Sequence, residues 1–212
     1  MPSCDYFSYE RKELIRFIPD TIEKTLDVGC GSGVFSRNLK KISGNVETWG
    51  IEIVEQYAKI AEQYLDHVLT GPIDRFYDKL PDAYYDCIFF NDVLEHLVEP
   101  EECLKRLKTK LKAGKTVIAS IPNIRHINIL LDLLFKKDWR YTESGIMDRT
   151  HLRFFTQKSI IRMFDTCGYK IERIEGINSV GRYCLTSIIN TLLFNALEDV
   201  KYKQFVVVAT PK

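Results

Sequence analysis

The chain has 212 residues, enough for one well-cored domain, and its 30 basic and 29 acidic side chains leave a formal net charge of +1. This balance gives no reason to expect nucleic acid or a membrane surface as a partner. The six cysteines form no C-x-x-C pair, and we expect neither a signal peptide nor a membrane span, which together predict a cytoplasmic protein with reduced thiols.

Helices and strands are predicted to alternate along most of the sequence. Strands are expected to end at Asp27 and Glu52 and to cover residues 67–69, 85–90, 115–120, 169–174 and 204–209. Helices are expected at residues 8–18, 34–41, 54–66, 100–112, 127–135, 157–167 and 186–199. The βαβα alternation predicts an α/β fold, in which a parallel sheet carries helices on both faces.

The first strand ends in the run Leu26-Asp27-Val28-Gly29-Cys30-Gly31-Ser32-Gly33. Its glycines let the chain adopt positive φ and let a ligand lie against bare peptide groups. The spacing is G-x-G-x-G, whereas dinucleotide sites have G-x-G-x-x-G. A carboxylate at Asp27 would repel a pyrophosphate but would accept hydrogen bonds from a cationic amine or a hydroxyl. The run therefore favours a zwitterionic nucleoside, S-adenosylmethionine, over NAD.

Two more strands are predicted to end at the same crevice. Glu52 ends the second strand, where an acidic side chain can bind the ribose hydroxyls of a nucleoside. The alternative is that Glu52 only caps the following helix. The other strand, an apolar one, is followed by the run Asn91-Asp92-Val93-Leu94-Glu95-His96. Because ligands bind outside the carboxyl ends of the strands in such sheets, we expect these residues to face Asp27 and Glu52.

The runs D-V-G-C-G-S-G and F-N-D-V-L-E-H-L resemble the first and fourth motifs of class I S-adenosylmethionine-dependent methyltransferases. The resemblance covers nearly the whole chain. It implies a Rossmann-like, doubly wound seven-stranded sheet, mostly parallel with an antiparallel last strand, and S-adenosylmethionine as cofactor with S-adenosylhomocysteine as product. The implied cofactor-binding residues are Asp27, Gly29, Cys30, Gly31, Gly33, Glu52, Ile53, Pro72, Ile73, Asn91, Asp92 and Val93. Pro72 departs from the family's G-D-[IVL] pattern, so the usual acid for the adenine amino group is missing there.

A long connection, residues 122–156, precedes the helix that is expected to begin at residue 157. Connections of this length are usually lids or binding loops, so we expect a single methyltransferase domain, residues 1–212, with an acceptor-side insertion. The runs I-P-N-I-R-H, W-R-Y and G-I-M-D-R-T-H-L-R-F-F-T resemble bacterial methyltransferases found with surface-polysaccharide and O-antigen biosynthesis genes. That subgroup implies a small acceptor, a sugar or glycan intermediate.

His151 is the first candidate for a general base, because transfer to a hydroxyl needs one and imidazole titrates near neutrality. Its alternative role is packing within the loop. Glu95 and His96 are the second candidates. D-V-L-E-H followed by T-H-x-x-F resembles the metal site of small-RNA 3′-end 2′-O-methyltransferases, which implies Asp92, Glu95, His96 and His151 as ligands of Mg²⁺ or Mn²⁺. The short Asp92 and the lack of a basic RNA track count against the ion, so a divalent metal is not favoured.

The predicted function is transfer of a methyl group from S-adenosylmethionine to a hydroxyl or amine of a small acceptor, a sugar or glycan intermediate. One alternative is a metal-assisted RNA or quinone-type O-methyltransferase, and another is a non-catalytic module that binds S-adenosylmethionine. Tyr9 and Arg11 are expected to reach the cofactor carboxylate or to lie on a solvated helix face. Asn123, Arg125 and His126 are expected to face the acceptor or to form only a turn.

Overall fold

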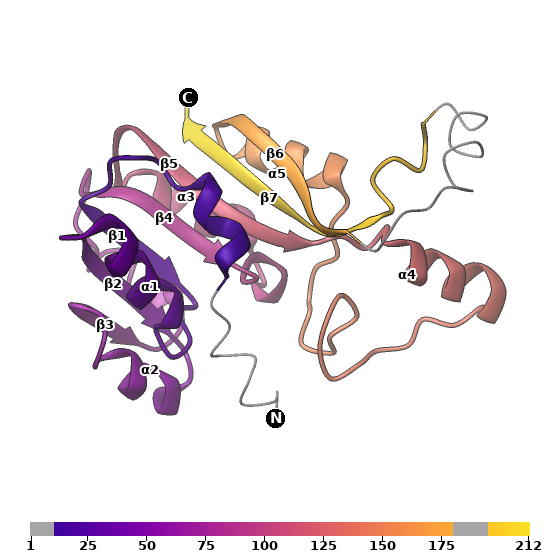
Figure 1. Cartoon of the computed structure of the whole chain (residues 1–212), viewed down its shortest axis with the longest axis horizontal. Helices are drawn as coiled ribbons and strands as arrows, with labels where there is room; N and C mark the ends of the chain where they lie inside the picture. The colour runs from indigo at the N-terminus through magenta and orange to yellow at the C-terminus, as the bar shows by residue number, and fades with distance from the viewer. Residues whose placement is uncertain (1–10, 180–194) are drawn as a thin grey trace.

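A seven-stranded sheet organises the part of the chain that the computed structural model describes, residues 11–179 and 195–212. Its strands are β1 (Lys24–Val28), β2 (Glu47–Glu52), β3 (His67–Thr70), β4 (Tyr85–Asn91), β5 (Leu111–Pro122), β6 (Tyr169–Ser179) and β7 (Tyr202–Pro211). Their order across the sheet is β3-β2-β1-β4-β5-β7-β6 (Figure 1). The first five strands pair in parallel, and β7 is antiparallel to both of its neighbours. The predicted doubly wound sheet is confirmed.

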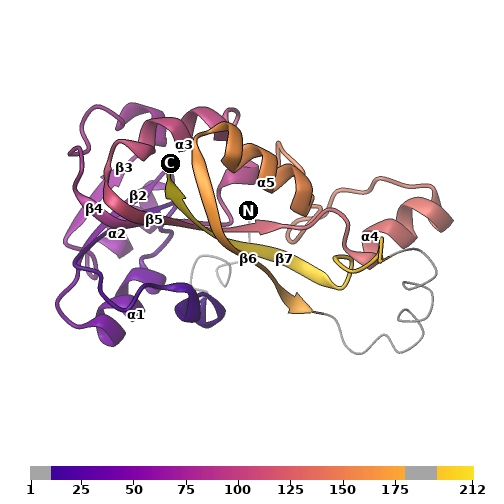
Figure 2. The ribbon, with the colours of Figure 1, turned by 90° about the horizontal axis from the view of Figure 1, so that it is seen from above.

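Helices cover both faces of the sheet. The helices of the described residues are η2 (Lys12–Phe17), α1 (Val34–Ser43), α2 (Glu55–Ala61), η3 (Ile73–Arg75), η4 (Leu94–His96), α3 (Pro100–Lys108), α4 (Ile127–Leu131), η5 (Asp132–Lys136) and α5 (Gln157–Thr166). α3 and α5 lie over one face, and η2 and α1 lie over the other (Figure 2). Successive β4 residues serve the two faces, because Ile88 and Phe90 pack in the α3–α5 cluster and Phe89 packs in the η2–α1 cluster.

Some helix boundaries differ from those predicted. The helix expected at 100–112 ends at Lys108, because the carbonyl of Lys110 accepts hydrogen bonds from the backbone of Tyr84 and Tyr85 and draws the chain into β5. The helix expected at 54–66 ends at Ala61. The opening helix is a short 3-10 segment within the described residues. Most of the helix expected at 186–199 lies outside the described residues.

The sheet positions a crevice at the carboxyl ends of β1 and β4. These two strands are neighbours, yet the chain leaves β1 toward β2 on one side and leaves β4 toward β5 on the other. Ligands bind at such a switch in strand order. The segment between β5 and α5 begins near this edge, and α4 projects from the sheet (Figure 1). None of the described helices is long and apolar enough to cross a membrane.

Candidate active site

The glycine loop turns directly after β1. Gly29 and Gly31 have φ of +71° and +55°, a region that residues with side chains rarely occupy. The backbone N–H groups of Gly29 and Cys30 both donate to the carbonyl of Ile51, over 2.8 and 3.0 Å. A Cβ added to Gly29 would lie 2.6 Å from Cγ2 of Val93. The loop is therefore held against the ends of β2 and β4, and its closest approach, at position 29, requires glycine.

A cavity of about 760 Å³ opens over this loop. All the predicted cofactor residues line it except Gly33. A Cβ on Gly33 would meet Cδ1 of Leu65 at 2.6 Å and the backbone of Ala61, so this glycine allows α1 to approach α2. Arg11 and Asp74 also line the cavity. Asp74 supplies a carboxylate two residues after the position where Pro72 replaces the acid of the family pattern.

Asp27 lies buried at the floor of the cavity. Its carboxylate accepts hydrogen bonds from Oγ of Ser36 at 3.1 Å and from Nδ2 of Asn91 at 3.3 Å. Burial away from water nevertheless raises the pKa of Asp27 to about 7, and the charge of nearby Glu52 adds to this shift. A cation in the cavity would favour the ionised form of Asp27.

Binding of S-adenosylmethionine, the cofactor predicted from the sequence, is expected to weaken as the pH falls below about 7. Protonation removes the negative charge that would attract the cationic amine of the cofactor, so the affinity should fall by up to about tenfold per pH unit. Calorimetric titrations between about pH 5.5 and about pH 7.5 measure this. Asp27→Asn should bind weakly at every pH. An affinity of the wild-type protein that stays constant over this range would show that Asp27 does not bind a cation.

Glu52 is 4% exposed and uses both carboxylate oxygens to hold backbone. Oε2 accepts a hydrogen bond from the N–H of Gly31 at 2.8 Å, and Oε1 accepts one from the N–H of Val54 at 2.9 Å. The second bond is the helix-capping role foreseen as the alternative. The first bond ties Glu52 to the glycine loop, and the residue lines the cavity. Each oxygen retains a second lone pair, so capping and binding of a ribose are compatible.

Asp92 belongs to a separate polar network. It has φ of +56°, and its carboxylate is 2.5 Å from the guanidinium of Arg11. Oγ of Ser120 and Nε2 of Gln204 also donate to this carboxylate, at 2.9 and 2.8 Å for Oδ1. The metal alternative drawn from the sequence placed Asp92 among the ligands. Its carboxylate is instead engaged by Arg11, Ser120 and Gln204. These contacts join β4, β5, β7 and the segment around Arg11.

Glu95, His96 and His151 converge, with one ligand atom of each within 4.8 Å of those of the other two. Glu95 is 1% exposed, and neither of its carboxylate oxygens has a hydrogen-bond partner among the described residues. Burial and the charge of Asp92 raise the pKa of Glu95 well above its usual range. The centroids of the imidazole rings of His96 and His151 lie 4.7 Å apart. The loop that carries His151 is fixed here because Leu152 and Arg153 donate backbone hydrogen bonds to the carbonyl of Glu95.

Both imidazoles are oriented by oxygen atoms on their Nδ1 side. Nδ1 of His151 is 3.0 Å from the carbonyl of Ile146, and Nδ1 of His96 is 3.2 Å from the carbonyl and from Oγ1 of Thr150. A carbonyl oxygen can only accept a hydrogen bond, so the Nδ1 that faces it carries the proton, and Nε2 keeps its lone pair when each ring is neutral. Burial and the neighbouring His96 lower the pKa of His151, which favours the neutral ring.

A second cavity, of about 860 Å³, meets the first at these residues. Glu95 and His151 line the second cavity, His96 lines the first, and Asp92 and Asp148 line both. The far walls of the second cavity come from α4, η5 and residues 138–149. A cofactor in the first cavity and an acceptor in the second would therefore face each other across the Glu95, His96 and His151 cluster.

Comparison with known proteins agrees with this geometry. The model of a family described as "Methyltransferase domain" matches residues 6–174. The chain belongs to this methyltransferase family. The match confirms the predicted enzyme class, an S-adenosylmethionine-dependent methyltransferase, and S-adenosylmethionine as its cofactor. A solved S-adenosylmethionine-dependent methyltransferase from Archaeoglobus fulgidus is 21% identical, with a TM-score of 0.72 over 94% of this chain and 91% of that one.

Curated relatives of the methyltransferase are named ubiquinone biosynthesis O-methyltransferases. The protein from Hydrogenovibrio crunogenus is 30% identical over 187 residues, which cover 83% of this chain and 76% of the relative. The protein from Aeromonas salmonicida is 23% identical over 167 residues, 74% of this chain. The chain spans 66% of the length of that relative, slightly less than two thirds. The surface-polysaccharide subgroup suggested by the insertion motifs is not among these relatives.

Other residues singled out in the sequence have structural roles. Nδ2 of Asn123 donates to the carbonyls of Asp199 and Tyr202, and Arg125 pairs with Asp199 at 2.7 Å. The N–H of Arg125 also donates to Oδ1 of Asn123 at 3.0 Å, and this local bond supports the turn interpretation. His126 is 2% exposed and lines the second cavity, and Tyr9 lies outside the described residues. The contact of Gln204 with Asp92 was not predicted from the sequence, although Gln204 is a polar residue directly before the apolar run 205–209.

Proposed function

We propose that this methyltransferase transfers the methyl group of S-adenosylmethionine to a hydroxyl of a small acceptor held in the second cavity. The supporting observation is the convergence of Glu95, His96 and His151 where the two cavities meet. Displacement at a sulfonium needs alignment of the acceptor, and a hydroxyl also needs help in losing its proton. In this proposal residues 122–156 provide the acceptor side of a single domain.

The cluster offers two ways to activate the hydroxyl. In the first, Nε2 of His151 accepts the hydroxyl proton directly, which its neutral form and its position beside the cavity allow. In the second, Glu95, His96 and His151 hold a divalent cation that lowers the pKa of the hydroxyl. We favour the second, because a base alone leaves the buried Glu95 carboxylate without a hydrogen-bond partner among the described residues. Imidazole and carboxylate donors fit a cation such as Mn²⁺, and oxygens behind Nδ1 are the usual support of metal-binding histidines.

The relatives favour a quinone-type acceptor, such as a phenol with neighbouring hydroxyls, over a carbohydrate. A carbohydrate acceptor keeps one supporting observation. The second cavity is lined by Trp139 and Tyr141 together with the carboxylates of Asp132 and Glu143, and aromatic faces combined with hydrogen-bonding groups suit a sugar ring as well as a phenol.

Transfer of labelled methyl groups from S-adenosylmethionine tests the proposal. The acceptors offered are an alkyl-substituted catechol and a set of nucleotide-linked sugars, each with Mn²⁺ and with EDTA. We expect labelled catechol ether and an equal amount of S-adenosylhomocysteine. Transfer to sugars alone would move the function to the carbohydrate acceptor. Binding of S-adenosylmethionine without transfer to any acceptor would support the non-catalytic alternative.

Glu52→Ala is expected to weaken S-adenosylmethionine binding roughly ten- to a hundredfold. Removing a charged hydrogen-bond partner costs about 1.5–3 kcal/mol, which corresponds to that change in affinity. Glu55→Ala is the matched control, because Glu55 is an exposed carboxylate in the first turn of α2, the helix that follows Glu52, and pairs with Lys59. Calorimetry on both variants decides the role of Glu52. Equal, small losses in the two variants would leave helix capping as its only function.

A further inference from the structure

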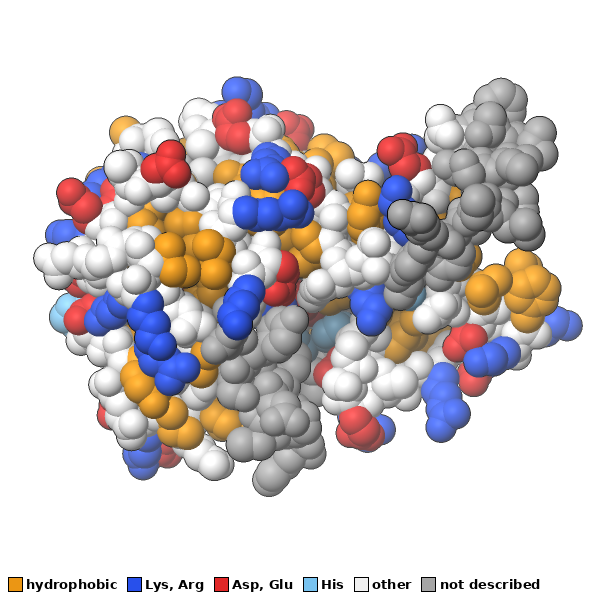
Figure 3. All heavy atoms as spheres, in the orientation of Figure 1, with side chains coloured by type: hydrophobic (Ala, Val, Ile, Leu, Met, Phe, Trp, Pro, Cys, Tyr) orange, Lys and Arg blue, Asp and Glu red, His pale blue; other side chains and the backbone are white. Residues whose placement is uncertain are grey.

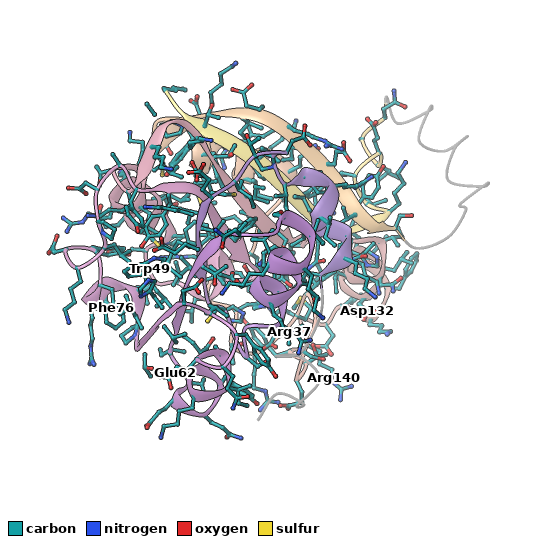
Figure 4. The ribbon with its side chains drawn as sticks, turned by 60° about the vertical axis from the view of Figure 1, so that its left-hand side comes forward. Arg37, Trp49, Glu62, Phe76, Asp132 and Arg140 are labelled. Atoms are coloured by element: carbon teal, nitrogen blue, oxygen red, sulfur yellow. The ribbon has the colours of Figure 1, made fainter. Side chains whose placement is uncertain are left out.

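A tight turn lies between the two cavities, next to the histidine cluster. Asp148 lines both cavities, Thr150 lines the first and His151 lines the second. Figure 3 shows histidine surface in the hollow between the main body and the projecting α4 segment. Asp132 and Arg140, from the far walls of the second cavity, lie at the same end of the molecule in Figure 4. The turn therefore stands between the space for the cofactor and the space for the acceptor.

Asp148 organises this turn through its backbone and one carboxylate oxygen. Its N–H donates to the carbonyl of Gly145, and its carbonyl accepts from the N–H of His151, both over 3.1 Å. Oδ1 accepts two further hydrogen bonds from Thr150, one from the backbone N–H at 2.8 Å and one from the hydroxyl at 2.7 Å. An aspartate that binds the backbone two residues ahead is typical of a turn. Asp148 is 7% exposed, so these bonds form largely out of reach of water.

The hydroxyl of Thr150 transmits this arrangement to His96. A hydroxyl has a single proton, and Thr150 donates it to Oδ1 of Asp148. Toward Nδ1 of His96, which is 3.2 Å away, Oγ1 of Thr150 can then only accept a hydrogen bond. Nδ1 must therefore carry the proton of the neutral ring, which leaves the lone pair of Nε2 for a ligand. The carbonyl of Thr150, also 3.2 Å from Nδ1, favours the same tautomer.

The carboxylate of Asp148 matters because the hydroxyl of Thr150 could otherwise rotate. A hydroxyl without an acceptor nearby is able to donate its proton to Nδ1 of His96. The proton of the neutral ring would then lie on Nε2, and the ring would have no lone pair left for a cation. Asp148 removes this alternative by taking the hydroxyl proton itself.

We propose that Asp148 and Thr150 are positioning residues for the cation site, with Asp148 fixing the hydroxyl of Thr150 and Thr150 fixing the tautomer of His96. Because Asp148 also holds the turn that ends at His151, one residue orients two of the three candidate ligands. Metal-binding histidines are commonly supported by a carboxylate, and here a threonine hydroxyl stands between the two groups. The inference rests on the proposed function, because a positioning role requires that the cluster binds a cation.

Binding of Mn²⁺ alone to the full chain tests the inference. The electron paramagnetic resonance signal of free Mn²⁺ measures the affinity without an acceptor and without turnover. Thr150→Val should weaken Mn²⁺ binding about tenfold, because valine has the shape of threonine but lacks the hydroxyl. Thr150→Ser keeps the hydroxyl and should bind nearly as the wild type does. Asp148→Asn should show a smaller loss than Thr150→Val, because an amide oxygen still accepts hydrogen bonds but carries no charge.

Thr210→Val is the matched control, because the hydroxyl of Thr210 also donates to a carboxylate, that of Glu172 at 2.9 Å, and Thr210 lines neither cavity. It should bind Mn²⁺ as the wild-type protein does. Calorimetry with S-adenosylmethionine on each variant checks that the fold and the first cavity are intact.

Two results would overturn the positioning role and leave the proposed function standing. One is wild-type Mn²⁺ affinity in Thr150→Val, and the other is a loss in Thr150→Ser as large as that in Thr150→Val. Unchanged Mn²⁺ affinity in Asp148→Asn overturns the role of the carboxylate even if Thr150→Val does not fold. Failure of the wild-type protein to bind Mn²⁺ would instead overturn the cation of the proposed function, and this inference with it.

Discussion

Gly31→Val is expected to abolish measurable binding of S-adenosylmethionine, a loss of at least about a hundredfold in affinity. Gly31 has φ of +55°, which a β-branched side chain avoids, so the loop must change its conformation. The change also removes the N–H of Gly31 from its position 2.8 Å from Oε2 of Glu52. The variant therefore damages both the backbone that lines the cavity and the carboxylate assigned to the ribose. Calorimetric titration with the cofactor measures the effect.

Gly114→Val is the matched control for backbone strain. Gly114 has φ of +71° and would place a Cβ in open space, far along the chain from the glycine loop. It should lose stability as Gly31→Val does but keep its affinity for S-adenosylmethionine. Unfolding transitions of the two variants, compared with the wild type, show whether strain alone is responsible. If Gly31→Val binds the cofactor normally, the cofactor site lies elsewhere in the fold.

It was predictable that Asp27, the glycine loop and Glu52 would line one crevice, because their signals are local. Asp27, the glycines and Glu52 are set by short runs at strand ends, and the parallel sheet then brings those ends to one edge. The role of Gly33 was not predictable in the same way. It follows the same pattern as Gly29, but what distinguishes it is contact with Leu65 and Ala61, which a local motif does not encode.

The acceptor side depends on contacts between distant parts of the chain. Gln204 and Asp92 are 112 residues apart in sequence, and their pairing decides that Asp92 is engaged rather than free to bind an ion. Helical periodicity placed a helix at 127–135 correctly, but an amphipathic pattern alone did not show that none of its residues would be fully buried. The convergence of Glu95 and His96 with His151 was suggested by resemblance. The structure adds that the carboxylate of Glu95 has no other partner among the described residues.

EDTA is expected to remove most of the methyl transfer and to leave the affinity for S-adenosylmethionine unchanged, with Mn²⁺ restoring the activity. Glu95, His96 and His151 supply the donor atoms, and the first cavity keeps its own lining residues when the cation is removed. Glu95→Gln should have a similarly low rate and should respond less to Mn²⁺, because an amide is a weaker ligand than a carboxylate. Transfer rates and cofactor calorimetry are measured on the same samples.

His151→Ala is expected to lower the rate of transfer by about 10²–10⁴-fold, whether His151 binds the cation or takes the proton itself. The two roles are separated by the response of the wild-type protein to chelation and by Glu95→Gln. A histidine that acts alone as base would leave the rate insensitive to EDTA, and Glu95→Gln would then stay active. His67→Ala is the control, since His67 lies on β3, pairs with Glu47 and lines neither cavity, and its variant should retain most of the activity. If His151→Ala turns over at the wild-type rate, both roles are excluded, and His151 only packs the loop against Ile146 and His96.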